Sequence, residues 1–310
     1  MGGMTENNSS QKATSDGVSQ PDSGLAFSQR NSSSYILPAL DQDFLLGDSM
    51  RGVRFLLEYA KAEEALRSWG VRSTIVVFGS ARVRQNGPGR HAYWYEQARQ
   101  FGLIASQRGG ALTDNGGVRD NVIATGGGPG LMEAANHGAH DAGAPSIGFN
   151  IRLPREQAPN DYSAPELTFQ FHYFAMRKMH LAMRANALVA FPGGFGTFDE
   201  LFEILTLRQT GKSPPIPIVL FDEKYWRAAV NFDALIASGT VDKSDCTLFR
   251  FAENAEEIWN QLLSCGLGVP GLSCPASRYR HLLDGRSTTS ATTAVDPPLD
   301  SAMSRCKPPH

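Results

Sequence analysis

The chain has 310 residues, a formal net charge of −2 and 41% hydrophobic residues. This nearly neutral balance gives no reason to expect nucleic acid or an anionic membrane as a partner, and no apolar stretch reaches the length of a spanning helix. The four cysteines form no C-x-x-C pair and no H-E-x-x-H occurs, so we expect no disulfide framework, metal or cofactor. The N-terminus lacks a signal-peptide pattern, which favours a cytoplasmic location.

Both ends of the chain differ in composition from the middle. Residues 1–34 contain nine serines, and residues 267–310 contain six prolines without a sustained hydrophobic period. Segments of this kind cannot bury enough apolar surface to offset the entropy of ordering. We therefore expect disordered tails at 1–34 and 268–310 on either side of a single folded domain at 35–267.

The middle of the chain alternates helical and strand patterns. A helical segment around Leu56 and Leu66 ends at Gly70, and a β-branched run at 74–78 then predicts a strand buried on both faces. The same patterns predict further elements: helices at 93–108 and 255–263, and strands at 121–125, 146–151, 187–191 and 216–221. Strands separated by helices imply right-handed crossovers, so the predicted fold class is α/β with a doubly wound parallel sheet.

Two glycine runs follow predicted strands, at 126–130 and at 193–196. Ligands of parallel sheets bind where strands give way to helices, glycine lets the backbone approach a ligand, and a helix N-terminus attracts anions. A tight turn explains one such run, but two favour nucleotide or sugar-phosphate binding. Neither run has the G-x-G-x-x-G spacing or a Walker A lysine, which disfavours dinucleotide-dependent oxidoreduction and a P-loop.

Charged residues flank the second glycine run. We expect a helix to begin at about Phe198, with its apolar and acidic residues on opposite faces: Phe198, Leu201, Phe202 and Leu205 against Asp199, Glu200 and Glu203. Acidic side chains interact favourably with the positive end of a helix dipole. A Glu200 carboxylate next to a bound phosphate would nevertheless be repelled by it, unless a nearby cation or a catalytic role explains its position. Arg177 and Lys178 supply a cation, and Arg177 suits either a phosphate contact or a charge clamp beside Glu200.

A carboxylate and a basic side chain beside a glycine loop suggest cleavage of a glycosidic bond in a phosphorylated sugar. Such a reaction passes through an oxocarbenium-like cation that a carboxylate stabilises while it activates water. The residues alone leave a second function open, a non-catalytic nucleotide- or cofactor-binding carrier of the same fold. A carrier would not need Arg177 and Glu200 beside the phosphate.

The motifs P-G-G-F-G-T-F-D-E at 192–200, Arg177-Lys178 and G-G-G-P-G-L-M at 126–132 resemble those of the Lonely Guy (LOG) family. The likeness spans about 74–263. It implies a Rossmann-like phosphoribohydrolase that releases the base from a nucleoside 5′-monophosphate, either AMP or a cytokinin riboside monophosphate. It also implies a homodimer or a higher homo-oligomer.

The resemblance assigns roles to individual residues. It makes Arg177 and Glu200 catalytic. It also implies six substrate-binding positions: Lys178, Gly193, Gly194, Gly196, Thr197 and Thr206. From the surrounding motifs we add five candidates: Phe195, Asp199, Gly127, Gly128 and Glu133. Glu133 is equally well explained as an ordinary acid at a helix N-terminus. Four apolar residues are candidates for a base pocket, although core is the expected place for each: Met132, Phe149, Phe195 and Trp226.

Overall fold

The computed structural model describes residues 24–112, 117–153 and 158–271, and it divides into two compact units, Met1–Arg54 and Phe55–His310. The described part of the first unit contains helices α1 (Gly24–Arg30) and α2 (Gln42–Leu46), with single 3₁₀ turns at Ser33–Tyr35 and Asp48–Met50. Secondary structure therefore begins inside the segment predicted as a disordered tail. Residues 1–23 of that tail, and residues 272–310 of the other, lie outside the described residues.

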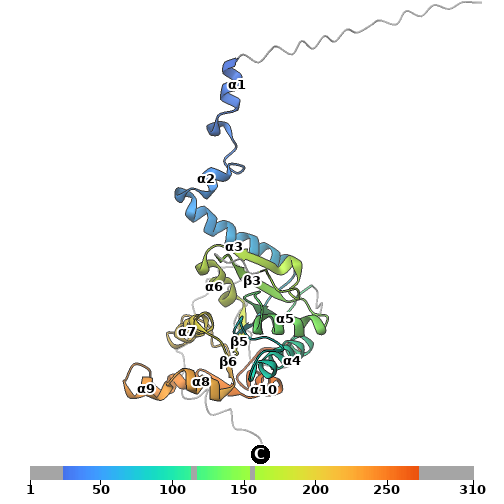
Figure 1. Cartoon of the computed structure of the whole chain (residues 1–310), viewed down its shortest axis with the longest axis vertical. Helices are drawn as coiled ribbons and strands as arrows, with labels where there is room; N and C mark the ends of the chain where they lie inside the picture. Colours follow the sequence, from blue (N-terminus) through green and yellow to red (C-terminus); the bar gives the residue numbers. More distant parts are fainter. Residues whose placement is uncertain (1–23, 113–116, 154–157, 272–310) are drawn as a thin grey trace, which may run out of the picture. The chain divides into compact units, whose positions relative to one another are not determined.

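The second unit is built on a seven-stranded sheet in which every described pair of neighbouring strands is parallel (Figure 1). Its order is β4-β3-β2-β1-β5-β6-β7. The strands have these bounds: β1 Thr74–Phe78, β2 Val122–Thr125, β3 Ile147–Ile151, β4 Thr168–Phe171, β5 Ala185–Ala190, β6 Ile218–Phe221 and β7 Arg250–Ala252. The predicted α/β class and its parallel sheet are confirmed.

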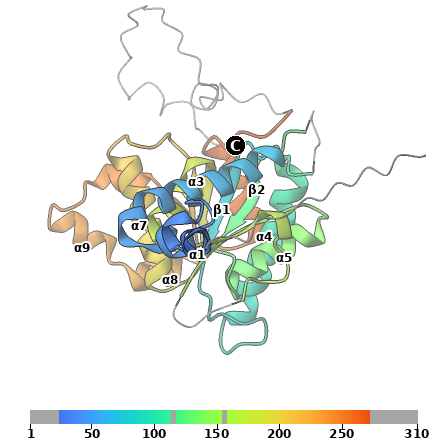
Figure 2. The same ribbon diagram turned by 90° about the horizontal axis from the view of Figure 1, so that it is seen from above.

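Helices cover both faces of this sheet (Figures 1 and 2). One face carries α4 (His91–Gly109), α5 (Leu131–Asp141) and α10 (Ala255–Ser264). The other carries most of α3 (Arg51–Ser68), α6 (Phe174–Met183), α7 (Phe195–Gln209) and α8 (Glu223–Ala229). Three short elements complete the described fold: α9 Phe232–Ala237 and the 3₁₀ turns Pro165–Leu167 and Lys243–Thr247.

The central strand shows why these residues form a sheet covered on both sides. All five residues of β1 are buried, with Ile75 and Val77 in the core under α4, α5 and α10, and Val76 and Phe78 in the core on the opposite face. Successive side chains of a strand point to opposite faces, so a strand covered on both sides must be apolar throughout. The β-branched run at 74–78 follows from this requirement.

The order of the strands fixes where a ligand can bind. From β1 the chain runs outward through β2, β3 and β4, and then returns to the other side of β1 with β5. The strand order therefore reverses direction between β1 and β5, and the connections on the two sides of this point run in opposite directions. At such a switch point a crevice opens at the carboxyl ends of the strands. Both glycine runs lie at this edge, one after β2 and one after β5.

Two predicted boundaries differ from the structure. Helix α7 begins at Phe195, because the Gly194 carbonyl already accepts hydrogen bonds from the N–H groups of Thr197 and Phe198. The second glycine run therefore extends into the first turn of the helix. At the other end of the domain, Val269 is 9% exposed and belongs to the core, so ordered packing continues beyond residue 267.

Candidate active site

Ser80 joins the two glycine runs at the switch point. It directly follows Gly79 at the end of β1, where its N–H donates to the Pro192 carbonyl at 3.0 Å. Its carbonyl accepts from the N–H of Leu131, the first residue of α5, at 3.1 Å. The loops after β1, β2 and β5 are thereby held together by main-chain hydrogen bonds.

The first glycine run is packed against protein atoms. Gly126, Gly127 and Gly128 are all buried. Gly127 has a φ of +69°, and a Cβ there would lie 2.3 Å from the Asn150 amide nitrogen. Glycine is therefore needed for both conformation and space. Asn160 fixes the run by donating its N–H to the Gly127 carbonyl at 2.9 Å and its side-chain amide to the Gly128 carbonyl at 3.1 Å.

The second glycine run, in contrast, faces outward. Gly194 and Gly196 are exposed, and added side chains there would meet no atom within 4 Å. Gly193 is buried beneath Thr197, whose hydroxyl oxygen would lie 2.1 Å from a Cβ at that position. No side chain caps α7 at Gly194. The first N–H groups of the helix lack intrahelical acceptors, and such helix termini attract anions.

Arg177 of α6 connects the two glycine runs. Its Nε donates to the Phe149 carbonyl on β3 at 2.8 Å. Its Nη2 lies against Gly126, where a Cβ would come within 2.5 Å of it, and its Nη1 is 3.9 Å from Oε1 of Glu200. The side chain is 12% exposed, and burial lowers the pKa of its guanidinium despite the attraction of Glu200 and Asp199. The predicted proximity of Arg177 and Glu200 is thus present in the structure.

Glu200 is buried, although the predicted helical wheel sets it with Asp199 and Glu203 on the face opposite the apolar residues. The buried residues of α7 are Thr197, Glu200, Leu201 and Ile204, and the Glu200 side chain is only 7% exposed. The helical wheel fails here because Arg177 and Lys178 of α6 face this side of α7 and receive the carboxyl group. Burial raises the pKa of Glu200, and it outweighs the opposite effect of both cations.

Lys178 is bound mainly to the two exposed acids of the same helix. Its Nζ lies 2.8 Å from Asp199 and 2.8 Å from Glu203, but 4.0 Å from Glu200. Burial lowers the pKa of this ammonium group, and the hydrogen bonds to Asp199 and Glu203 more than compensate, so the pKa is raised overall. Lys178 therefore stays charged at the edge of the site, but it forms its close ion pairs with Asp199 and Glu203 rather than with Glu200.

The remaining predicted residues occupy varied positions. Phe195 is 94% exposed within the second run, so its expected place in the core is wrong, whereas Phe149 and Trp226 are core residues as expected. The Thr206 hydroxyl donates to the Phe202 carbonyl in its own helix at 2.7 Å. Glu133 accepts a hydrogen bond from the hydroxyl of Tyr95 at 3.0 Å. Met132 is half-buried at the start of α5, near Gly126.

Two residues that contact the glycine runs were not found from the sequence. The Asn150 amide nitrogen is buried against Gly127 and has no hydrogen-bond partner among the described residues. Tyr225 of α8 donates its hydroxyl to the Gly193 carbonyl at 2.5 Å. Neither belongs to a local motif, and each reaches its glycine run only because neighbouring strands bring distant segments together.

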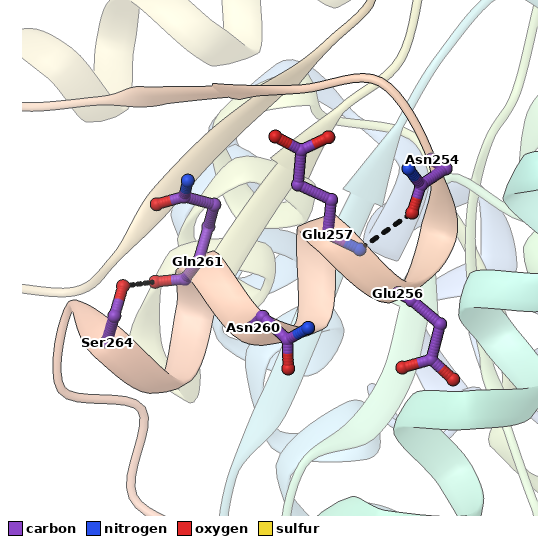
Figure 3. A pocket seen from close by; sticks show the side chains of 6 residues that line it. All are labelled: Asn254, Glu256, Glu257, Asn260, Gln261 and Ser264. Carbon is purple, nitrogen blue, oxygen red and sulfur yellow. Dashed lines mark hydrogen bonds between the residues drawn. The ribbon is translucent and has the colours of Figure 1, made fainter. Parts of the chain in front are cut away.

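A hollow of about 530 Å³ lies elsewhere, on the outer surface of α10 (Figure 3). Six polar residues line it: Asn254, Glu256, Glu257, Asn260, Gln261 and Ser264. It carries two acids and no basic side chain, so it does not suit an anion.

Within the described ranges, His, Cys, Asp and Glu side chains form no group of three or more that could hold a metal. None of the helices there combines the length and hydropathy needed to cross a membrane.

Comparison with known proteins gives one family and several curated relatives. A family model described as "Possible lysine decarboxylase" matches residues 132–262. A rice (Oryza sativa subsp. japonica) protein named probable cytokinin riboside 5′-monophosphate phosphoribohydrolase LOG4 is 30% identical over 145 residues, which cover 46% of this chain and 62% of that protein. The LOG2 phosphoribohydrolase of Arabidopsis thaliana is 28% identical, with coverage of 44% and 65%. The chain thus spans less than two thirds of the length of these two relatives.

Solved structures also align with this chain. The crystal structure of TM1055, a structural-genomics target, has 21% identity and a TM-score of 0.44, and covers 61% of this chain and 96% of its own. The molybdenum cofactor binding protein from the phototrophic bacterium Rippkaea orientalis has 18% identity and a TM-score of 0.41, with coverage of 63% and 95%.

The family model covers much of the site, although it begins after the first glycine run. The family model spans the start of α5, Arg177-Lys178 and the whole of the second glycine run with Glu200. The curated relatives named above are phosphoribohydrolases by name. The resemblance predicted from the motifs is confirmed: over the residues of the site this chain is similar to phosphoribohydrolases of the Lonely Guy (LOG) family.

Proposed function

We propose that the protein is a hydrolase that cleaves the N-glycosidic bond of a nucleoside 5′-monophosphate, giving free base and ribose 5-phosphate. AMP and cytokinin riboside monophosphates are the candidate substrates. The observation that carries the proposal is the Glu200 carboxyl group, buried 3.9 Å from Arg177 beside the uncapped start of α7. The names of the curated relatives support the same reaction.

The 5′-phosphate would bind at the start of α7. The N–H groups of Gly194, Phe195 and Gly196 lie in the exposed first turn, and the helix dipole adds positive potential there. Gly194 and Gly196 have no side chain that would keep the phosphate away from the backbone. Lys178, 17% exposed, adds a positive charge at the same edge.

The chemistry would take place beside Glu200. As the bond between C1′ and the base nitrogen breaks, its electron pair leaves with the base and positive charge develops on C1′ and the ring oxygen. The Glu200 carboxylate stabilises this charge and accepts a proton from the attacking water, whose oxygen bonds to C1′. The departing base takes up a proton from solvent. A raised pKa makes Glu200 a stronger base than an ordinary glutamate, while Arg177 keeps its ionised form accessible.

We also propose a cytoplasmic homodimer or higher homo-oligomer, as the family resemblance implies. Phe195, which lies within the proposed phosphate-binding turn, is 94% exposed, and a second subunit near the site would cover its side chain. Light scattering of the purified chain measures the oligomeric state directly.

Incubation with a panel of nucleoside monophosphates tests the proposed activity. We expect equal amounts of free base and ribose 5-phosphate from at least one of AMP and a cytokinin riboside monophosphate, separated and quantified by chromatography. The matching nucleoside without phosphate should be cleaved poorly, because it lacks the group that binds α7. Nucleotide binding without release of base from any member of the panel would contradict the proposal and favour the carrier.

A further inference from the structure

Tyr225 supports the second glycine run from behind. It belongs to α8, which follows β6, and β6 pairs with β5 in the sheet. Its hydroxyl donates to the carbonyl of Gly193, the residue covered on another side by Thr197. The peptide group that joins Gly193 to Gly194 is thus held through its oxygen.

This hydrogen bond also sets the direction of an N–H group. In a trans peptide the carbonyl of one residue and the N–H of the next point in opposite directions. Because Tyr225 holds the Gly193 carbonyl on the protein side, the Gly194 N–H points away from Tyr225. Gly194 is exposed and stands at the uncapped start of α7, so this N–H belongs to the turn proposed to bind phosphate.

A buried carboxylate fixes the tyrosine itself. Asp222 is 1% exposed, and its Oδ1 accepts from the Tyr225 N–H at 3.1 Å. Its Oδ2 accepts from the Trp94 indole at 2.7 Å and pairs with Arg90 at 2.8 Å. The Trp94 ring also packs edge-on against Tyr225, with centroids 5.7 Å apart. Asp222 has a φ of +70°, a strained conformation for a residue other than glycine, and these partners hold it there.

We infer that Tyr225 is a positioning residue of the phosphate subsite, whose hydroxyl holds the Gly193 carbonyl so that the Gly194 N–H faces the bound phosphate. The inference rests on the proposed function, since that function places phosphate at this turn. Tyr225 acts through the glycine peptide and does not itself contact the substrate. Its effect should therefore fall on phosphate affinity rather than on bond cleavage.

Tyr225→Phe tests the inference, because it removes the hydroxyl and keeps the ring. We expect the KM for the nucleoside monophosphate that the wild type cleaves best to rise about tenfold, with kcat changed less than threefold. The dissociation constants of ribose 5-phosphate and inorganic phosphate, measured by calorimetry, should rise in parallel.

Tyr93→Phe is the matched control. The Tyr93 hydroxyl also donates to a main-chain carbonyl at 2.6 Å, but its acceptor is Glu253, which follows β7 and belongs to neither glycine run. Both variants lose one tyrosine-to-carbonyl hydrogen bond, so their melting temperatures should fall by similar small amounts. Only Tyr225→Phe should weaken phosphate binding.

The outcomes separate this inference from the proposed function. Unchanged phosphate affinity in Tyr225→Phe, or an equal loss in Tyr93→Phe, would overturn the positioning role, and so would a wild type that binds no phosphate. A wild type that binds phosphate but cleaves no nucleotide would remove only the proposed reaction. The calorimetric comparison of the two variants would then still decide the role of Tyr225.

Discussion

Two buried arginine–glutamate pairs lie at opposite ends of α6 and differ in how closely their charges meet. Arg184, which follows the helix, donates two hydrogen bonds of 2.8 Å to Glu63 of α3, and their side chains are 3% and 8% exposed. Arg177, two turns earlier, is 3.9 Å from Glu200 of α7, and their side chains are 12% and 7% exposed. Residue types and burial are nearly the same, but only the first pair forms close hydrogen bonds.

The pKa values of the two glutamates are shifted in opposite directions. The hydrogen bond from Arg184 lowers the pKa of Glu63 in spite of burial. Burial raises the pKa of Glu200. Arg177 and Lys178 lower it, but they act from 3.9 and 4.0 Å and do not offset the effect of burial. Buried charges are tolerated when they are fully paired, and a loosely paired carboxylate retains reactivity. We therefore expect the first pair to stabilise the fold, whereas under the proposed function the second would provide an acid–base group at the switch point.

The largest effect that the comparison predicts is on catalysis. Glu200→Gln keeps the size of the side chain and removes its charge and basicity, so turnover of the nucleoside monophosphate should fall about 10²- to 10⁴-fold. Nucleotide affinity, measured by calorimetry, should change little, because the phosphate is proposed to bind at the start of α7. The melting temperature should also stay close to that of the wild type, since the lost ion pair is a loose one.

Glu203→Gln is the control for this variant. Glu203 lies one turn from Glu200 on α7 and bonds Lys178 at 2.8 Å, but its carboxylate is 41% exposed. Its loss should reduce turnover less than fivefold, since exposed ion pairs contribute little. Wild-type turnover in Glu200→Gln, or equal losses in the two variants, would remove Glu200 from its assigned role.

The second prediction concerns stability. Glu63→Gln leaves the Arg184 guanidinium buried without its carboxylate, and breaking a buried pair in this way costs about 3 kcal/mol of the free energy of unfolding. Urea unfolding followed by circular dichroism measures the change. Turnover per folded molecule should stay at the wild-type level, because Glu63 and Arg184 lie away from the glycine runs. Loss of turnover in the folded protein, with stability unchanged, would reverse the two roles.

The fold could be predicted from the sequence because its signals are local. The β-branched run at 74–78 and the apolar run at 187–191 are typical of strands in a sheet covered on both faces, and the helical patterns between predicted strands show the alternation directly. Helix boundaries were less certain. Phe195, Gly196 and Thr197 form the first turn of α7 although glycine is a poor helix former, because the first residues of a helix need no intrahelical hydrogen bond.

The site could be predicted only in part. The positions of Arg177 and Glu200 followed from their motifs, but the burial of Glu200 depends on how α6 packs against α7, and a helical wheel of α7 alone contains no such information. Asn150 and Tyr225 reach the glycine runs through the pairing of β3 with β2 and of β6 with β5. Contacts set by the order of strands carry no signal in any short stretch of sequence.

The third prediction separates the two glutamates by pH. The pKa of Glu200 is raised above its usual value of 4.5, so its carboxylate is lost, and kcat/KM falls, at a pH where an ordinary glutamate is still ionised. The pKa of Glu63 is lowered below 4.5, so its stabilisation is complete above that value and disappears only as the pH falls through the lower, folded-state pKa. On acidification, activity should therefore decline before the melting temperature does.

Profiles of kcat/KM and of melting temperature against pH, measured on the same preparation, provide the test. In Glu63→Gln the acid limb of kcat/KM should remain where it is in the wild type. The melting temperature of this variant should depend less on pH in the acid range, because the titration of Glu63 no longer contributes to stability. This follows because the two carboxyl groups titrate in separate surroundings, one bonded by Arg184 and the other only near Arg177. An acid limb that moved together with the melting curve would mean that a single unfolding event controls both, and the contrast between the two pairs would then have no functional meaning.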